Sequence, residues 1–168
     1  MTTPPEVWLR GPLAGFPPLL QPVAHAIKQA QNEIHELMQD FPDELLWEKP
    51  MGLASPGFHL QHITGVIDRM ATYAQAKTLS EQQFAYLKKE GVPDTNLTTQ
   101  ILLENLDRQI VDFLDFVSKI NPETLPDYRG VGRAQLPSTV GGLVFHAAEH
   151  TQRHLGQLLV TVKVVLGS

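Results

Sequence analysis

The chain has 168 residues, the usual length of one compact domain, and 42% of them are hydrophobic. It contains no cysteine, which excludes disulfides, thiolate metal sites and cysteine nucleophiles and is compatible with a reducing compartment. The net charge is -5 and lysine and arginine form no cluster, so a nucleic-acid partner is not expected. No apolar run is long enough for a membrane span and the N-terminus does not resemble a signal peptide, so we expect a cytoplasmic protein.

The first half of the chain predicts a lead-in and two long helices. Residues 1–18 are rich in proline and predict an irregular segment that packs through Trp8, Leu9 and Phe16. Apolar residues at steps of three and four then predict a helix over about 19–40. After a loop, the same period predicts a helix over about 56–77, which Ser55 would cap and Pro56 would begin.

The second half predicts a short helix followed by two long ones. A capping-box pattern predicts a helix from Ser80 to about Lys89. Apolar periodicity predicts long helices over about 97–120 and 138–165, joined by an irregular connection over 121–137. No run alternates as a strand would, so the fold class expected is all-α, a four-helix bundle with long connections.

Five of the seven histidines fall in two clusters on helix faces that should point to the core. His59 and His62 lie near the start of the second long helix, and His146, His150 and His154 lie in the last one. Residues four apart share a helix face and can bind one ion together, whereas positions 146 and 154 are about 12 Å apart along the axis. The pair that binds an ion is therefore 146/150 or 150/154, and spacing alone does not decide between them. A third ligand would come from the first cluster.

The alternative is that these histidines are hydrogen-bonded core residues, as a single core-facing histidine usually is. Burying several imidazoles without partners would cost about 1–3 kcal/mol each, a cost that a shared ion removes. Other motifs are weaker. Gly141 and Gly142 could leave amides free for an anion but more simply allow close packing. The Glu-x-x-His pairs of di-metal bundles are absent from both clusters, which argues against ferritin-like chemistry.

Three segments of the chain resemble motifs of the DinB superfamily, in the same order and over nearly the whole sequence. The run His150-Thr-Gln-Arg-His154-Leu-Gly-Gln157 resembles the HxxxHxGQ signature of that family. The run from Ser55 to Ile63 resembles the motif of its second helix, and Trp47-Glu-Lys-Pro50 resembles a loop that often precedes it.

The resemblance implies one DinB-like domain over residues 1–168, with residues 1–18 as its lead-in. It implies a metal held by one histidine of the second helix and two of the last, which are His62, His150 and His154 here. The ion implied is a divalent transition metal, most simply zinc or nickel. His59 and His146 have no firm place in that ligand set and would lie beside it. Gln157 would orient a ligand ring or a water.

Members of the family include thiol-dependent S-transferases, so the resemblance implies a metal-dependent enzyme that uses an external low-molecular-weight thiol. A metal-dependent hydrolase and a non-enzymatic, stress-related metal-binding protein are the alternatives. The partner expected is a small molecule, with no nucleic acid and no membrane. Apolar residues beside the core-facing stripes are more than one core needs, and they predict a homodimer: Ile101, Leu102, Phe116, Val144, Leu155 and Leu159.

Overall fold

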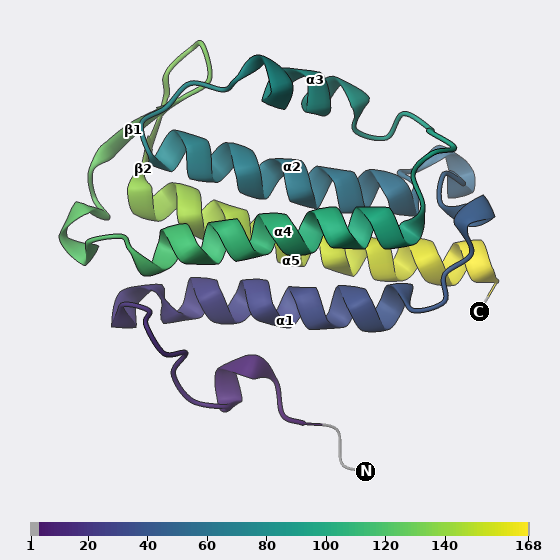
Figure 1. Ribbon diagram of the computed structural model, residues 1–168, viewed down its shortest axis with the longest axis horizontal. Coiled ribbons are helices and arrows are strands. Elements are labelled where there is room, and N and C mark those ends of the chain that lie inside the picture. The colour runs from purple at the N-terminus through teal and green to yellow at the C-terminus, as the bar shows by residue number, and fades with distance from the viewer. Residues whose placement is uncertain (1–3, 168) are drawn as a thin grey trace.

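The computed structural model describes residues 4–167, most of which are helical. Four long helices form the body of the molecule: α1 (Gln21–Met38), α2 (Pro56–Ala74), α4 (Thr99–Ser118) and α5 (Val140–Leu166). They lie alongside one another, and a shorter helix, α3 (Glu81–Lys89), lies against α2 on the outside (Figure 1). The ranges predicted from apolar periodicity agree with these helices to within three residues at each end.

The connection before α5 contains a β-hairpin, and the expectation of no strands was wrong. β1 (Tyr128–Val131) pairs antiparallel with β2 (Leu136–Thr139), so that Tyr128 lies opposite Thr139. Strands of four residues are too short for an alternating pattern to appear, and Pro137 in β2 disguises the second strand further. The remaining short elements are 3-10 turns at Val7–Leu9, Pro18–Leu20, Asp43–Leu45, Pro50–Gly52 and Pro122–Thr124.

Side-chain caps fix where the helices begin, as the sequence predicted for α2 and α3. The hydroxyl of Ser55 accepts a hydrogen bond from the amide of Phe58 at 3.2 Å, and Pro56 occupies the first turn of α2. Ser80 and Gln83 form a complete capping box at the start of α3. The start of α2 is held further by Trp47, whose ring packs on Gly57 where a Cβ atom would not fit.

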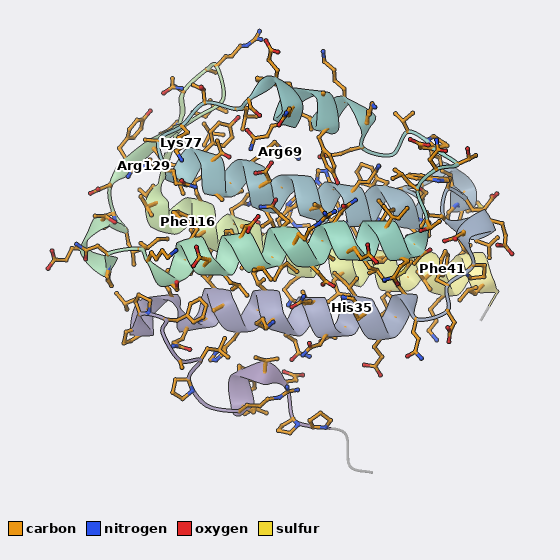
Figure 2. The ribbon with its side chains drawn as sticks, in the orientation of Figure 1. His35, Phe41, Arg69, Lys77, Phe116 and Arg129 are labelled. Carbon is orange, nitrogen blue, oxygen red and sulfur yellow. The ribbon has the colours of Figure 1, made fainter. Side chains whose placement is uncertain are left out.

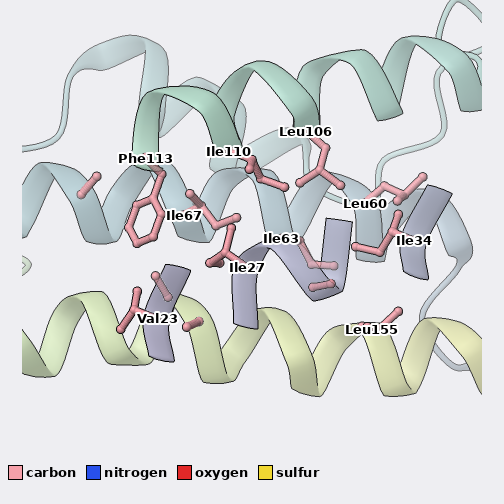
Figure 3. Close-up of a cluster of buried hydrophobic side chains, with 14 of the residues drawn as sticks. Val23, Ile27, Ile34, Leu60, Ile63, Ile67, Leu106, Ile110, Phe113 and Leu155 are labelled. Carbon is pink, nitrogen blue, oxygen red and sulfur yellow. The ribbon is translucent and has the colours of Figure 1, made fainter. Parts of the chain in front are cut away.

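One hydrophobic core joins the four long helices. Ile27 of α1, Ile63 of α2 and Ile110 of α4 are completely buried, and Leu155 of α5 is nearly so (Figure 3). Burying each isoleucine side chain contributes about 1.5–3 kcal/mol to stability. The core therefore holds α2 and α5 side by side without help from the histidines.

The lead-in packs differently from the prediction. Trp8 and Leu9 are exposed, whereas Val7 is buried and Phe16 is partly buried against the core. The amide of Val7 donates to the side chain of Gln29 at 2.8 Å, which ties the first turn to α1.

The residues that suggested a second interface belong largely to the core of the single chain. Leu102, Val144 and Leu155 are buried within it, so they are not surplus to one core. Ile101 and Leu159 are exposed and Phe116 is partly buried. No helix in the described part of the chain is long and apolar enough to cross a membrane.

Candidate metal centre

The packing of α2 against α5 brings the two histidine clusters together. Nδ1 of His59 lies 3.0 Å from Nδ1 of His154, and Nε2 of His62 lies 3.0 Å from Nε2 of His150. Rising residue numbers in α2 thus meet falling numbers in α5, so the two helices are antiparallel. The antiparallel packing of α2 on α5 therefore explains why histidines far apart in the sequence are in contact.

His62, His150 and His154 each offer one ring nitrogen to a common point. Their three ligand atoms lie within 4.8 Å of one another, and the ring centroid of His154 is 4.5 Å from those of His62 and His150. Two nitrogens bound to one ion at about 2.1 Å lie about 3.0–3.4 Å apart, close to the separation of His62 and His150. The three imidazoles therefore fit a divalent transition metal.

A buried carboxylate fixes the proton of His62. Oε2 of Glu90 accepts a hydrogen bond from Nδ1 of His62 at 2.7 Å, so the lone pair is on Nε2, the nitrogen that faces His150. Arg69 donates to the other oxygen of Glu90 at 2.6 Å. The side chains of Glu90 and Arg69 are only 5% and 8% exposed. This chain of contacts holds the ring of His62 in the orientation that a metal ligand needs.

The end of α3 carries Glu90 into place beside α2. The side-chain oxygen of Gln61 accepts a hydrogen bond from the amide of Gly91 at 2.8 Å, and the hydroxyl of Tyr86 donates to the carbonyl of Gln61 at 3.2 Å. Gly65 leaves the space that Glu90 and Arg69 fill, because a Cβ atom there would collide with both side chains. α3 therefore belongs to the site although it carries none of the three histidines.

His59 contacts the ring of His154. It is buried, and its Nδ1 engages Nδ1 of His154, which leaves Nε2 of His154 as the nitrogen available to an ion. Phe58 stacks on the ring of His62 with centroids 5.1 Å apart and an interplanar angle of 14°. Both contacts restrict ring rotation before any ion binds.

Burial favours the neutral form of His59, His150 and His154. It lowers the pKa of His59 to about 4, that of His150 to about 4 and that of His154 to about 3, and the neighbouring His62 adds to each shift. Metal ligation requires the unprotonated ring, so the folded chain presents His150 and His154 in the form that binds.

A second group of ligand-type side chains shares His150. His146, Glu149 and His150 also have ligand atoms within 4.8 Å of one another. Glu149, however, already pairs with Nδ1 of His146 and with Arg153, both at 2.7 Å, and these side chains lie towards solvent. Nδ1 of His150 is buried without a hydrogen-bond partner in the described structure. In the triad, His154 and His62 contact the buried side chains of His59 and Glu90, whereas the carboxylate of the second group is already paired with His146 and Arg153 near solvent.

The other residues considered from the sequence have no hydrogen bond or ion pair with the triad in residues 4–167. Gln157 is exposed, His25 contacts the carbonyl of Gly11 at 3.1 Å, and His35 pairs with Asp107 at 2.8 Å. Glu90 and Arg69 were not predicted from the sequence. Arg69 could have been noticed, because it lies two helical turns after His62 on the same face of α2. Glu90 gives no local signal, since only the fold brings it to His62.

Comparison with known proteins agrees with this architecture. A family model described as the DinB superfamily matches residues 26–158. A crystal structure of a conserved protein from Enterococcus faecalis is similar, with a TM-score of 0.70 and 16% identity, over 89% of this chain and 98% of that one. At this identity the similarity shows a shared fold. No curated protein matches the sequence.

Proposed function

Because this chain belongs to the DinB superfamily, we propose that it is a metal-dependent enzyme built on that family's four-helix bundle. Its site would hold one divalent transition metal, zinc or nickel, through His62, His150 and His154. The observation that carries the proposal is the convergence of three imidazole nitrogens, one of them oriented by a buried carboxylate. Three protein ligands leave coordination positions for water or substrate, as in catalytic zinc sites.

The reaction we propose joins an external low-molecular-weight thiol to a second substrate: the thiol sulfur bonds to an electrophilic carbon, the bond from that carbon to its leaving group breaks, and the thiol proton is released. The chain has no cysteine of its own, so a thiol nucleophile must come from a cosubstrate. When bound, a divalent ion would lower the pKa of a thiol that coordinates it and so supply a thiolate at neutral pH. His62 is 21% exposed, so small molecules can reach the site from solvent.

The roles of the surrounding residues follow from their contacts. Glu90 keeps the proton of His62 on Nδ1, and His59 engages Nδ1 of His154, so that the other nitrogen of His154 is left for an ion. Phe58 covers one face of His62 and limits access of water from that side. These residues hold the ligand rings in place, so that coordination requires little rearrangement.

The test uses untagged protein loaded with zinc or nickel, a panel of small thiols and a fluorogenic alkyl halide. We expect thioether formation that requires metal and thiol, is lost in His150→Ala and is kept in the matched control His25→Ala. Metal-dependent ester hydrolysis without any thiol would instead indicate the hydrolase. If the protein binds metal but catalyses neither reaction, the enzyme proposal is contradicted, and the non-enzymatic metal-binding protein is the remaining alternative.

A further inference from the structure

A second site lies at the other end of α2, where the helix meets the hairpin. A cavity of about 460 Å³ opens between the end of α2, the start of α3, strand β1 and the hairpin turn that follows it. Lys77 and Arg129 both line it, and Figure 2 labels them next to each other where α2 ends. Tyr73 lies eleven residues after His62 (73 − 62), which places this cavity about 16 Å along the axis from the metal centre.

Three cations line this one cavity in a chain of net negative charge. They are Lys77, Arg129 and Arg133, and no carboxylate is among the lining residues. None of the three forms an ion pair with an acidic side chain in residues 4–167. The cavity therefore carries uncompensated positive charge, whereas Arg69 and Arg153 elsewhere are paired with glutamates.

Contacts with the protein fix the positions of the two guanidinium groups, those of Arg129 and Arg133. Nε of Arg129 donates to the carbonyl of Ala74 at 2.8 Å and its Nη1 donates to that of Tyr128 at 2.7 Å. The guanidinium of Arg133 lies 5.9 Å from the centre of the Phe84 ring. Carbonyl oxygens and an aromatic face orient a guanidinium but do not cancel its charge, so both arginines can still attract an anion.

Aromatic side chains supply the remaining walls. Tyr73, Phe84 and Tyr128 line the cavity and are accompanied by Leu79. Flat rings favour stacking or edge contacts with another ring, while a few fixed polar groups set the orientation of a ligand. We propose that this cavity binds a small aromatic anion, a molecule with one flat apolar ring system and one carboxylate or sulfonate group.

A matched pair of probes tests the proposal. Naphthalene-2-sulfonate carries one flat aromatic ring system and one negative charge, and naphthalene is the same ring system without the sulfonate. Calorimetric titration of the full chain should show one site that binds the anion roughly tenfold more tightly than the neutral probe, because the cations interact only with the former. Equal affinity for the two probes would overturn the proposal.

Charge-reversal variants locate the site. Lys77→Glu combined with Arg133→Glu should weaken binding of the anion at least about tenfold and leave the neutral probe within about twofold. Lys49→Glu combined with Lys163→Glu makes the same change in net charge at exposed positions outside the cavity and should leave both affinities unchanged. If both double variants weaken binding of the anionic probe equally, net charge explains the binding, and the proposed location of the site is wrong.

A third variant tests the aromatic wall, and a metal titration separates this site from the other one. Phe84→Ala should weaken both probes, because it removes apolar contact that they share. All the variants are at exposed positions, and unchanged circular dichroism would show that they fold. Metal affinity should be the same in all of them, so failure of this proposal leaves the proposed metal centre untouched.

Discussion

Each of the three imidazoles has a partner or an environment that decides which nitrogen can face an ion. Glu90 accepts the Nδ1 proton of His62, and His59 engages Nδ1 of His154. His150 differs, because its Nδ1 is buried without a partner and only its Nε2 faces another ligand ring. Orientation of the site therefore depends most on Glu90, which is the only acidic side chain in residues 4–167 that pairs with a ring of the triad.

Glu90→Gln should weaken metal binding while leaving the fold intact. The amide keeps the shape of the carboxylate but loses the charge that fixes the Nδ1 proton of His62, and changes of this kind cost about 10–100-fold in affinity. Competition with a chromogenic chelator measures the dissociation constant. Glu36→Gln, at an exposed position on α1, is the matched control. Equal affinity in parent and Glu90→Gln would show that Glu90 does not orient the site.

At the scale of elements, α3 presses its C-terminal end against α2, and one glycine makes this possible. Gly65→Ala places a Cβ atom against Glu90 and Arg69, and it should destabilise the protein by about 1–3 kcal/mol and also weaken metal binding. Gly156→Ala is the matched control, because it lies in the interior of α5 with nothing within 4 Å of its Cβ position. That change should stabilise the protein by about 0.5–1 kcal/mol.

Chemical denaturation and metal titration of both glycine variants check this prediction. The free energy of unfolding should fall in Gly65→Ala and rise in Gly156→Ala, although both variants exchange glycine for alanine within a helix. A Gly65→Ala variant as stable as the parent, with parent-like metal affinity, would mean that α3 does not need close contact at this point.

The helices were predictable because local signals specify them. Apolar periods of three and four, Ser55 before Pro56 and the capping box at Ser80 are all visible within a few residues. The hairpin was not, since its two short strands depend on pairing with each other. The spacing of the histidines made it possible to expect that they converge from two helices. The hydrogen bond between His62 and Glu90 could not be expected, because these residues are 28 positions apart and only the packing of α3 brings them together.

At the scale of the whole molecule, buried imidazoles make stability depend on pH. The folded chain resists protonation of His59, His150 and His154, whose pKa values lie near 4, 4 and 3, while the unfolded chain takes up those protons near 6.5. The unfolded state thus binds more protons between these values, so the free energy of unfolding of the metal-free protein should fall as pH drops from about 6.5 to about 4.

Urea denaturation at several pH values between about 4 and 7 measures this dependence. The variant His154→Gln removes one of the three groups and should show a shallower slope, while acidic residues titrate alike in both proteins. Identical slopes in parent and variant would contradict the account of His154 as a ring kept neutral by burial.

We also predict a homodimer, with exposed apolar side chains as its basis. Phe145, Leu159 and Val160 are exposed on α5 and Ile101 on α4. Burying such residues between two copies would remove apolar surface from water. Light scattering at micromolar concentration should give about twice the chain mass of 18.7 kDa. A mass equal to that of one chain would contradict the prediction.

The central claim is that His62, His150 and His154 form the metal centre, and the sharpest measurement compares His62→Ala with His146→Ala. His150 belongs to both groups of potential ligands, whereas each of these two histidines belongs to one group alone. Zinc dissociation constants are measured by chelator competition on untagged protein. We expect one ion per chain, a loss of more than about 100-fold in affinity for His62→Ala and parent-like affinity for His146→Ala. The reverse order, or parent-like binding in His62→Ala, would contradict the account.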